Sequence, residues 1–129
     1  YCAAGHPLFD MAPGRVSTDR VRASRYVGIG YHSPNMEVSR RLEQQRHATA
    51  YDQEAVAHLV LSGRYVGYLP EHYAEGFVAR EVMRPLLPHT FQYLCRFSAI
   101  VRHSPPPNRI VQTLLDALVA AHGPSPGSR

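Results

Sequence analysis

The order of apolar and polar residues divides this chain into short strands and helices. The clearest stretch is LVLSGRYVGYLPEHYAE, residues 59–75, which holds an apolar helical run, a glycine, an aromatic strand and a proline before more helix. Gly63 predicts a helix end and a tight reversal into the strand 64–69, because glycine is common just after a helix C-terminus. Pro70 predicts the end of that strand and the start of a helix, since proline lacks the N–H that a ladder needs.

Two earlier segments repeat this order of strand and helix. Strands are also expected at residues 25–31 and 46–51, and each precedes a segment with a good helix-capping residue. Strands that alternate with helices pair in parallel through crossover helices. The pattern therefore predicts an α/β fold built around a parallel sheet. The residues expected to begin the helices are Ser33 with Pro34, Asp52 and Pro70.

The second half of the chain follows a different pattern. Residues 82–88 and 91–103 read as two further strands, the second long and aromatic, and SPPP then interrupts the chain. An amphipathic helix is expected in NRIVQTLLDALVAAH, residues 108–122. Without the rest of its subdomain, this helix is expected to expose Leu114, Leu115 and Leu118 and to self-associate through its apolar face. Apolar residues at helical spacing in the two amphipathic helices are Ala55, Val56, Leu59 and Val60 in the first, and Ile110, Val111, Leu114, Leu115, Leu118 and Val119 in the second.

Composition and charge restrict the class of protein. With 129 residues, 44% hydrophobic and 19% charged, the chain suits one globular domain, and no apolar run approaches the ~20 residues of a membrane span. The chain opens at Tyr1 on strand-like sequence without a signal peptide, so we expect an internal part of a longer polypeptide. The formal charge is +4, but the fourteen basic residues, all arginines, are scattered, which does not favour direct nucleic-acid binding. Cys2 and Cys95 are expected to be buried thiols in a reducing cytoplasm.

Three strand ends carry candidate binding residues. In open parallel α/β sheets, ligands bind beyond the carboxyl ends of the strands, where helix N-termini favour anionic groups. Each expected strand ends at or just before a tyrosine, whose flat ring and hydroxyl suit a small aromatic or carboxylate-bearing molecule. The alternative is that these tyrosines only pad the strand ends against neighbouring helices. The candidate binding residues are Tyr31, His32, Ser33, Tyr51, Asp52, Gln53, Tyr68, Leu69 and Pro70.

Residues typical of catalysis are present without catalytic spacing. His32 with Ser33, Asp52 and His58 include the residue types of a hydrolase triad, yet no G-x-S-x-G elbow surrounds Ser33, which suits a helix cap. The eight histidines show neither H-E-x-x-H nor Cys-His ligand spacing, and VGIGY is too short for a phosphate-binding loop. The sequence therefore indicates no enzyme, no catalytic residues, no metal site and no cofactor.

Three stretches together resemble a known family. YCAAGHPLF, then YDQEAVAHLVLSGRYVGYLPEHYAEGFVAREVMRPLLP, then FSAIVRHSPPPNRIVQTLLDAL resemble, in order and spacing, the C-terminal part of LysR-type transcriptional regulators. The similarity runs from Tyr1 to about Leu118 and includes an HPL motif early in the chain. One position departs from it, because the family often has glycine where Glu81 stands. The turn at Glu81 is therefore expected to differ.

The resemblance implies the two-subdomain architecture of type 2 periplasmic binding proteins. The chain would hold mainly the second subdomain, an α/β unit with a mixed, mostly parallel sheet flanked by helices. The implied division is a crossover strand at residues 1–9, the second effector-binding subdomain at 10–90, a second crossover strand and C-terminal helix returning to the first subdomain at 91–122, and a disordered tail at 123–129. A winged helix-turn-helix, a linker helix and the first half of the effector domain would precede it.

The resemblance also implies a function. A cytoplasmic, homo-oligomeric bacterial regulator would sense a small molecule in the cleft between its subdomains and pass the change to DNA through the N-terminal domain. The cleft loops would be those at residues 31–33, 51–53 and 68–70, which strand polarity also indicates. The main alternative is a solute-binding protein of a transporter with the same fold, which a signal peptide upstream would favour. An enzyme is a third alternative.

Overall fold

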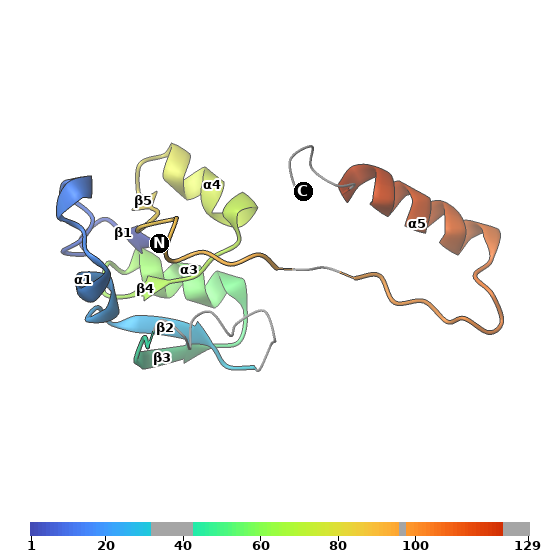
Figure 1. The fold of residues 1–129 in the computed structure, drawn as a ribbon, viewed down its shortest axis with the longest axis horizontal. Coiled ribbons are helices and arrows are strands. Elements are labelled where there is room, and N and C mark those ends of the chain that lie inside the picture. Colours follow the sequence, from blue (N-terminus) through green and yellow to red (C-terminus); the bar gives the residue numbers. More distant parts are fainter. Residues whose placement is uncertain (32–42, 96–97, 123–129) are drawn as a thin grey trace. The chain divides into compact units, whose positions relative to one another are not determined.

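The computed structural model describes residues 1–31, 43–95 and 98–122 (Figure 1). The chain divides into two compact units, Tyr1–Cys95 and Arg96–Arg129. Among the described residues, the first unit holds all the strands and most of the helices, and the second holds one helix. Each unit is described by itself. No helix within the described ranges is long and apolar enough to cross a membrane.

The first unit is built around a three-stranded parallel sheet. Its strands are β2 (Tyr26–Ile29), β3 (Arg46–Ala50) and β4 (Val66–Gly67), in the order β3-β2-β4 with both pairs parallel. The parallel α/β arrangement that the strand and helix order predicts is therefore confirmed. The strands are shorter than expected, and the helix predicted after Ser33 and Pro34 lies outside the described residues.

Two further strands form a separate antiparallel sheet. β1 (Cys2–Ala3) pairs with β5 (Met83–Arg84). Beside it, the backbone nitrogen of Tyr1 donates to the carbonyl oxygen of Gly67 at 2.8 Å, and the N–H of Gly67 donates to the oxygen of Tyr1 at 3.1 Å. The start of the chain thus joins β4 to the β1–β5 pair. The strand expected over residues 1–9 stops at Ala3 because Gly5 turns the chain with φ +87°.

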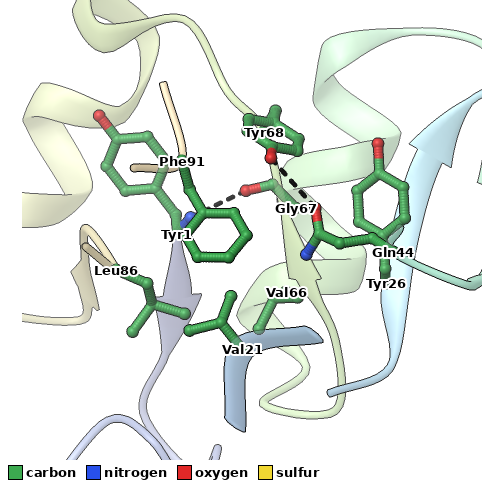
Figure 2. A pocket seen from close by; sticks show the side chains of 9 residues that line it. All are labelled: Tyr1, Val21, Tyr26, Gln44, Val66, Gly67, Tyr68, Leu86 and Phe91. Atoms are coloured by element: carbon green, nitrogen blue, oxygen red, sulfur yellow. Dashed lines mark hydrogen bonds between the residues drawn. The ribbon is translucent and has the colours of Figure 1, made fainter. Parts of the chain in front are cut away.

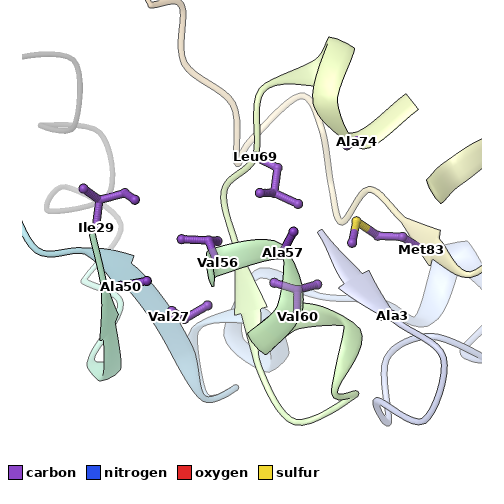
Figure 3. Close-up of a cluster of buried hydrophobic side chains, with 10 residues drawn as sticks. All are labelled: Ala3, Val27, Ile29, Ala50, Val56, Ala57, Val60, Leu69, Ala74 and Met83. Carbon is purple, nitrogen blue, oxygen red and sulfur yellow. The ribbon is translucent and has the colours of Figure 1, made fainter. Parts of the chain in front are cut away.

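Helix α3 (Gln53–Leu61) covers one face of the parallel sheet. Figure 3 shows its buried side chains beside those of β2 and the β1–β5 pair. Val56 and Val60, from the predicted apolar face, are 1% and 0% exposed, whereas Ala55 and Leu59 lie partly buried at its margin. The core cluster on this face consists of Ala3, Val27, Ile29, Ala50, Val56, Ala57, Val60, Leu69, Ala74 and Met83.

A second core cluster includes those residues of β2 and β4 whose side chains alternate with the side chains that face α3. Tyr26 of β2 and Val66 of β4 belong to it, while their neighbours Val27 and Gly67 pack toward α3. This is the alternation of side chains expected along a strand. Side chains from three other segments complete the cluster: α1 (Thr18–Arg22), the loop around a 3-10 turn at Pro13–Arg15, and the segment after β5. Its buried members are Cys2, Leu8, Val16, Val21, Tyr26, Val66 and Leu86.

The ends of α3 form as the sequence predicts. The carboxylate of Asp52 accepts the N–H of Ala55 at 2.7 Å, which caps the helix N-terminus. At the C-terminus Gly63 adopts φ +70°, and a Cβ at this position would lie 2.6 Å from the carbonyl oxygen of Ala4. Glycine is therefore required both by the left-handed conformation and by the close approach of the β1 turn.

Helix α4 (Glu71–Ala79) follows Pro70 as predicted and ends in an unusual way. The N–H of Val82 donates to the carbonyl oxygen of Phe77 at 3.1 Å, and that of Glu81 donates to Val78 at 2.9 Å. These two bonds form a Schellman motif, in which the residue in the left-handed region is usually glycine. Glu81 occupies that place with φ +57°, so the unusual turn expected at this residue is a glycine-type turn made by a glutamate.

The second unit contains helix α5 (Arg109–His122), which confirms the helix expected near the C-terminus. Its apolar face is not buried: Ile110 is 80% and Leu114 59% exposed. The prediction of a long strand at residues 91–103 is wrong, because residues 91–95 and 98–103 form no strand. A strand needs a neighbour for its backbone groups, and the described residues offer none there.

The two cysteines lie in different environments. Cys2 is fully buried in β1, and burial raises the pKa of its thiol. Cys95 is exposed, and both thiols are free. The expectation of two buried thiols therefore holds for Cys2 and is wrong for Cys95, because the strand that would have buried Cys95 does not form.

Candidate functional site

The carboxyl ends of β2, β3 and β4 lie at one edge of the parallel sheet. Tyr31, Tyr51 and Tyr68 each follow one of these strands by one or two residues, so the sheet brings three of the predicted positions to the same edge. The N-termini of α3 and α4 begin at this edge as well. His32 and Ser33, the other residues predicted after the first strand, lie outside the described residues.

Tyr31 and Tyr51 are the exposed part of this edge. Tyr31 is 53% and Tyr51 74% exposed. The ring of Tyr51 lies against Gly30, since a Cβ on Gly30 would come within 2.6 Å of its Cε1 and 2.9 Å of its Cζ. Both residues therefore present large aromatic surface to solvent, next to the last residues of the sheet.

Asp52 caps helix α3, whereas Gln53 has a buried oxygen without a hydrogen-bond partner. The carboxylate of Asp52 is held by the N–H of Ala55, so its negative charge lies at the N-terminus of α3. A carboxylate there competes with an anionic ligand for the helix amides. The Oε1 of Gln53 is buried and has no hydrogen-bond partner. A buried acceptor without a donor is costly, and a ligand donor near Gln53 would satisfy it.

Tyr68, Leu69 and Pro70 are less open. The Tyr68 hydroxyl donates to Oε1 of Gln44 at 3.0 Å, and burial raises the pKa of this phenol, with smaller contributions from Tyr26 and Tyr93. Leu69 is 8% exposed and packs in the core beside α3. Pro70 precedes α4, whose N-terminus no side chain caps. Of the two helix N-termini at this edge, that of α4 is therefore the better one for an anionic group.

The structure reveals an aromatic cluster that the sequence did not indicate. The ring of Tyr68 lies 5.9 Å from that of Tyr26, edge to face, and 5.3 Å from that of Tyr93. Burial, followed by the nearby Cys95, raises the pKa of Tyr93 to about 12. Alternation along β2 and β4 places Tyr26 and Tyr68 on one face and could have suggested their contact. Tyr93 and Gln44 come from irregular segments, where no pattern marks them.

A small depression lies beside this cluster, with a cavity volume of about 20 Å³ (Figure 2). Apolar side chains form most of its lining, and the hydroxyl of Tyr68 with the amide of Gln44 forms the polar part. Its volume is below the ~300–1,000 Å³ of typical ligand pockets. The main lining residues are Val21, Tyr26, Gln44, Tyr68, Leu86 and Phe91.

Two of the residues considered for a hydrolase triad are described, and both have partners within α3. Asp52 caps a helix, and Nδ1 of His58 lies 2.9 Å from the carbonyl oxygen of Glu54 within α3. Both members of the suggested triad that are described therefore have helix partners. Within residues 1–31, 43–95 and 98–122, no group of three His, Cys, Asp or Glu side chains could hold a metal ion.

Comparison with known proteins adds the family. Residues 1–123 match the family described as "LysR substrate binding domain". Over 121 residues the chain is 37% identical to the "HTH-type transcriptional activator BauR" of Pseudomonas aeruginosa. The match covers 94% of this chain and 40% of that relative, so the chain spans well under half of the relative's length. No solved structure is significantly similar to the chain.

Proposed function

This chain belongs to the LysR family, through its substrate-binding domain, and we propose that it is the effector-binding part of a transcription regulator. The observation that carries the proposal is the family match together with the sheet edge where Tyr31, Tyr51 and Tyr68 meet two helix N-termini. Edges of this kind are where open α/β sheets bind small molecules. Both comparisons are with regulators, so the solute-binding alternative is not favoured.

The proposal assigns the family's type 2 periplasmic-binding-protein architecture to this chain. Residues 10–90 would form the second subdomain, residues 1–9 a crossover connection, and residues 91–122 the return to the first subdomain. The effector would lie against three loops at the carboxyl edge of the parallel sheet. Those loops are residues 31–33, 51–53 and 68–70. The effector would be a small molecule with an aromatic or carboxylate group.

The connection between β4 and β1 suggests how binding would be transmitted. Tyr68 follows Gly67 directly, and Gly67 exchanges two backbone hydrogen bonds with Tyr1 at the start of β1. A shift of the 68–70 loop on binding would therefore reach the segment that enters the subdomain. An effector can change the balance between two arrangements only by binding one more tightly, and each tenfold difference in affinity supplies about 1.4 kcal/mol.

The wider role follows from the relative. Its name describes a transcriptional activator of the helix-turn-helix type. We propose that the intact protein likewise activates transcription, contacts DNA through an N-terminal helix-turn-helix domain, and acts in the cytoplasm as a homo-oligomer. No step of this role requires a catalytic residue, a metal ion or a cofactor.

The test begins with the coding DNA upstream of Tyr1. A helix-turn-helix pattern in frame is expected there. A signal peptide, with a basic and then an apolar stretch before a small-residue cleavage site, would refute the proposal that the protein is a transcription regulator. The intact gene product is then tested for footprints on its own upstream DNA, with and without a panel of small carboxylic and aromatic acids. A footprint that changes with one acid supports the proposal. Absence of any footprint contradicts it.

A further inference from the structure

Tyr51 has an unusual position for a large aromatic side chain. It is 74% exposed, although it lies next to the buried Ala50 at the end of β3. An exposed aromatic ring at a strand end gains little from the fold itself. What holds the ring in place is therefore informative about its purpose.

Gly30 provides the space that the ring of Tyr51 occupies. A Cβ on Gly30 would lie 2.6 Å from Cε1 and 2.9 Å from Cζ of Tyr51, and 2.8 Å from Cγ2 of Thr49. Gly30 does not have a positive φ, so its backbone does not require glycine. The absent side chain at residue 30 instead lets the ring of Tyr51 lie against the backbone at the end of β2.

The backbone on both sides of the ring is held in place. The N–H of Gly30 donates to the carbonyl oxygen of Ala50 at 2.7 Å, which ties the ends of β2 and β3 together. The residue after Tyr51 is Asp52, whose carboxylate caps α3 through Ala55. A ring that rests on one strand and is anchored between a strand and a capped helix loses little freedom when a ligand contacts it.

We propose that Tyr51, resting on Gly30, is a stacking platform that selects effectors carrying a planar unsaturated group. The inference rests on the proposed function, because it assumes that the carboxyl edge of the sheet faces the effector. Tyr31, 53% exposed and adjacent to Gly30 in sequence, adds a second aromatic surface at the same edge. Stacking on an aromatic ring favours a planar π-system over a saturated ring of similar size, by about three- to tenfold in affinity.

The experiment compares two probes on the intact gene product. Benzoate and cyclohexanecarboxylate carry the same carboxylate on a planar and on a saturated six-membered ring, and their affinities are measured by titration calorimetry. Benzoate is expected to bind about three- to tenfold more tightly. Tyr51→Ala is expected to remove this preference, and Tyr51→Phe to keep it, because the platform uses the ring and not the hydroxyl.

Gly30→Ala provides an independent variant. The new methyl group is compatible with the backbone but displaces the ring of Tyr51, so the preference for benzoate should fall as in Tyr51→Ala. Gly76→Ala is the matched control, since a Cβ on Gly76 meets nothing within 4 Å. Its preference should equal that of the unchanged protein. Far-UV circular dichroism of each variant establishes that it is folded.

The outcomes separate this inference from the proposed function. Equal affinity for the two acids, a preference that survives Tyr51→Ala, or no binding of either acid would overturn the platform. In each of these cases a footprint on DNA that responds to another small molecule would leave the proposed function standing. A preference that is lost in both Tyr51→Ala and Gly30→Ala but kept in Gly76→Ala supports the platform.

Discussion

Helices α3 and α5 both carry apolar residues at helical spacing, but these residues are buried in α3 and exposed in α5. In α3, Val56 and Val60 are 1% and 0% exposed, whereas in α5 Ile110 and Leu114 are 80% and 59% exposed. α3 packs against strands of its own unit, and its side chains belong to one core cluster with theirs. The described part of the second unit contains α5 and no strand or other helix. A periodic pattern thus states which face of a helix can be buried, but not what will cover it.

The largest effect is expected where α3 meets the turn after β1. Gly63→Ala should destabilise the chain by about 3 kcal/mol, because it adds a left-handed backbone penalty to a contact with the Ala4 oxygen. The measurement is urea unfolding followed by circular dichroism. Gly14→Ala, at a position where a Cβ meets nothing within 4 Å, is the control. A Gly63→Ala midpoint equal to that of the control would show that the close approach is not rigid.

A matched pair of valines tests the comparison directly. Val60→Ala should cost about 2 kcal/mol, since it removes two methyl groups from a fully buried site and leaves a cavity. Val119→Ala in α5, where valine is 70% exposed, should change stability by less than about 0.5 kcal/mol. The free energies come from urea titrations of both variants. Similar costs at the two sites would mean that α5 is covered in solution.

The helix caps extend the test to single hydrogen bonds. Asp52→Ala removes the bond to the Ala55 N–H and should cost about 1 kcal/mol of global stability. Asn108→Ala removes the equivalent bond to the Val111 N–H at 3.0 Å. Because α5 has no buried face, this change should lower helical ellipticity at 222 nm with little effect on the urea midpoint. A lower midpoint in Asn108→Ala would contradict the absence of a buried face on α5.

The end of α4 should respond in the opposite direction. Glu81→Gly should stabilise the chain by about 0.5–1 kcal/mol, because glycine relieves the left-handed conformation but adds freedom to the unfolded chain. Thermal unfolding monitored by circular dichroism would register a higher midpoint. Glu75→Gly, in the interior of the same helix, serves as the control and should lower the midpoint. A decrease for Glu81→Gly would imply that its side chain makes a compensating contact.

The smallest expected effect is a dependence on pH that arises in the first unit. His6 is buried, its Nδ1 accepts the N–H of Leu8 at 3.1 Å, and burial lowers its pKa below the ordinary 6.5. Below pH 6.5 the unfolded chain therefore binds a proton that the folded chain excludes. Stability should be lost as pH falls from 7 to 5, as measured by urea midpoints. His6→Asn should flatten the profile, and an unchanged slope would assign the effect elsewhere.

Local signals in the sequence predicted much of the first unit. Asp52, Gly63 and Pro70 marked helix ends correctly, because capping and backbone conformation depend on one or two neighbours. The prediction of a long strand at residues 91–103 failed because a strand depends on more than its neighbours in sequence. Its aromatic and apolar residues favour an extended chain, but a strand also needs a partner that local sequence does not report.

For the candidate site, the sequence by itself predicted which edge of the parallel sheet carries the candidate residues, and the tertiary structure decided which of them are exposed. Alternation of strand and helix established parallel pairing, and strand polarity then placed Tyr31, Tyr51 and Tyr68 at one edge of the sheet. Only the packing showed that Tyr51 rests on Gly30 in the open while Tyr68 is half-buried against Tyr26. Periodicity is a property of neighbouring residues along the chain, whereas exposure depends on contacts between segments far apart in sequence. The same reason explains why the apolar face of α3 is buried and that of α5 is exposed.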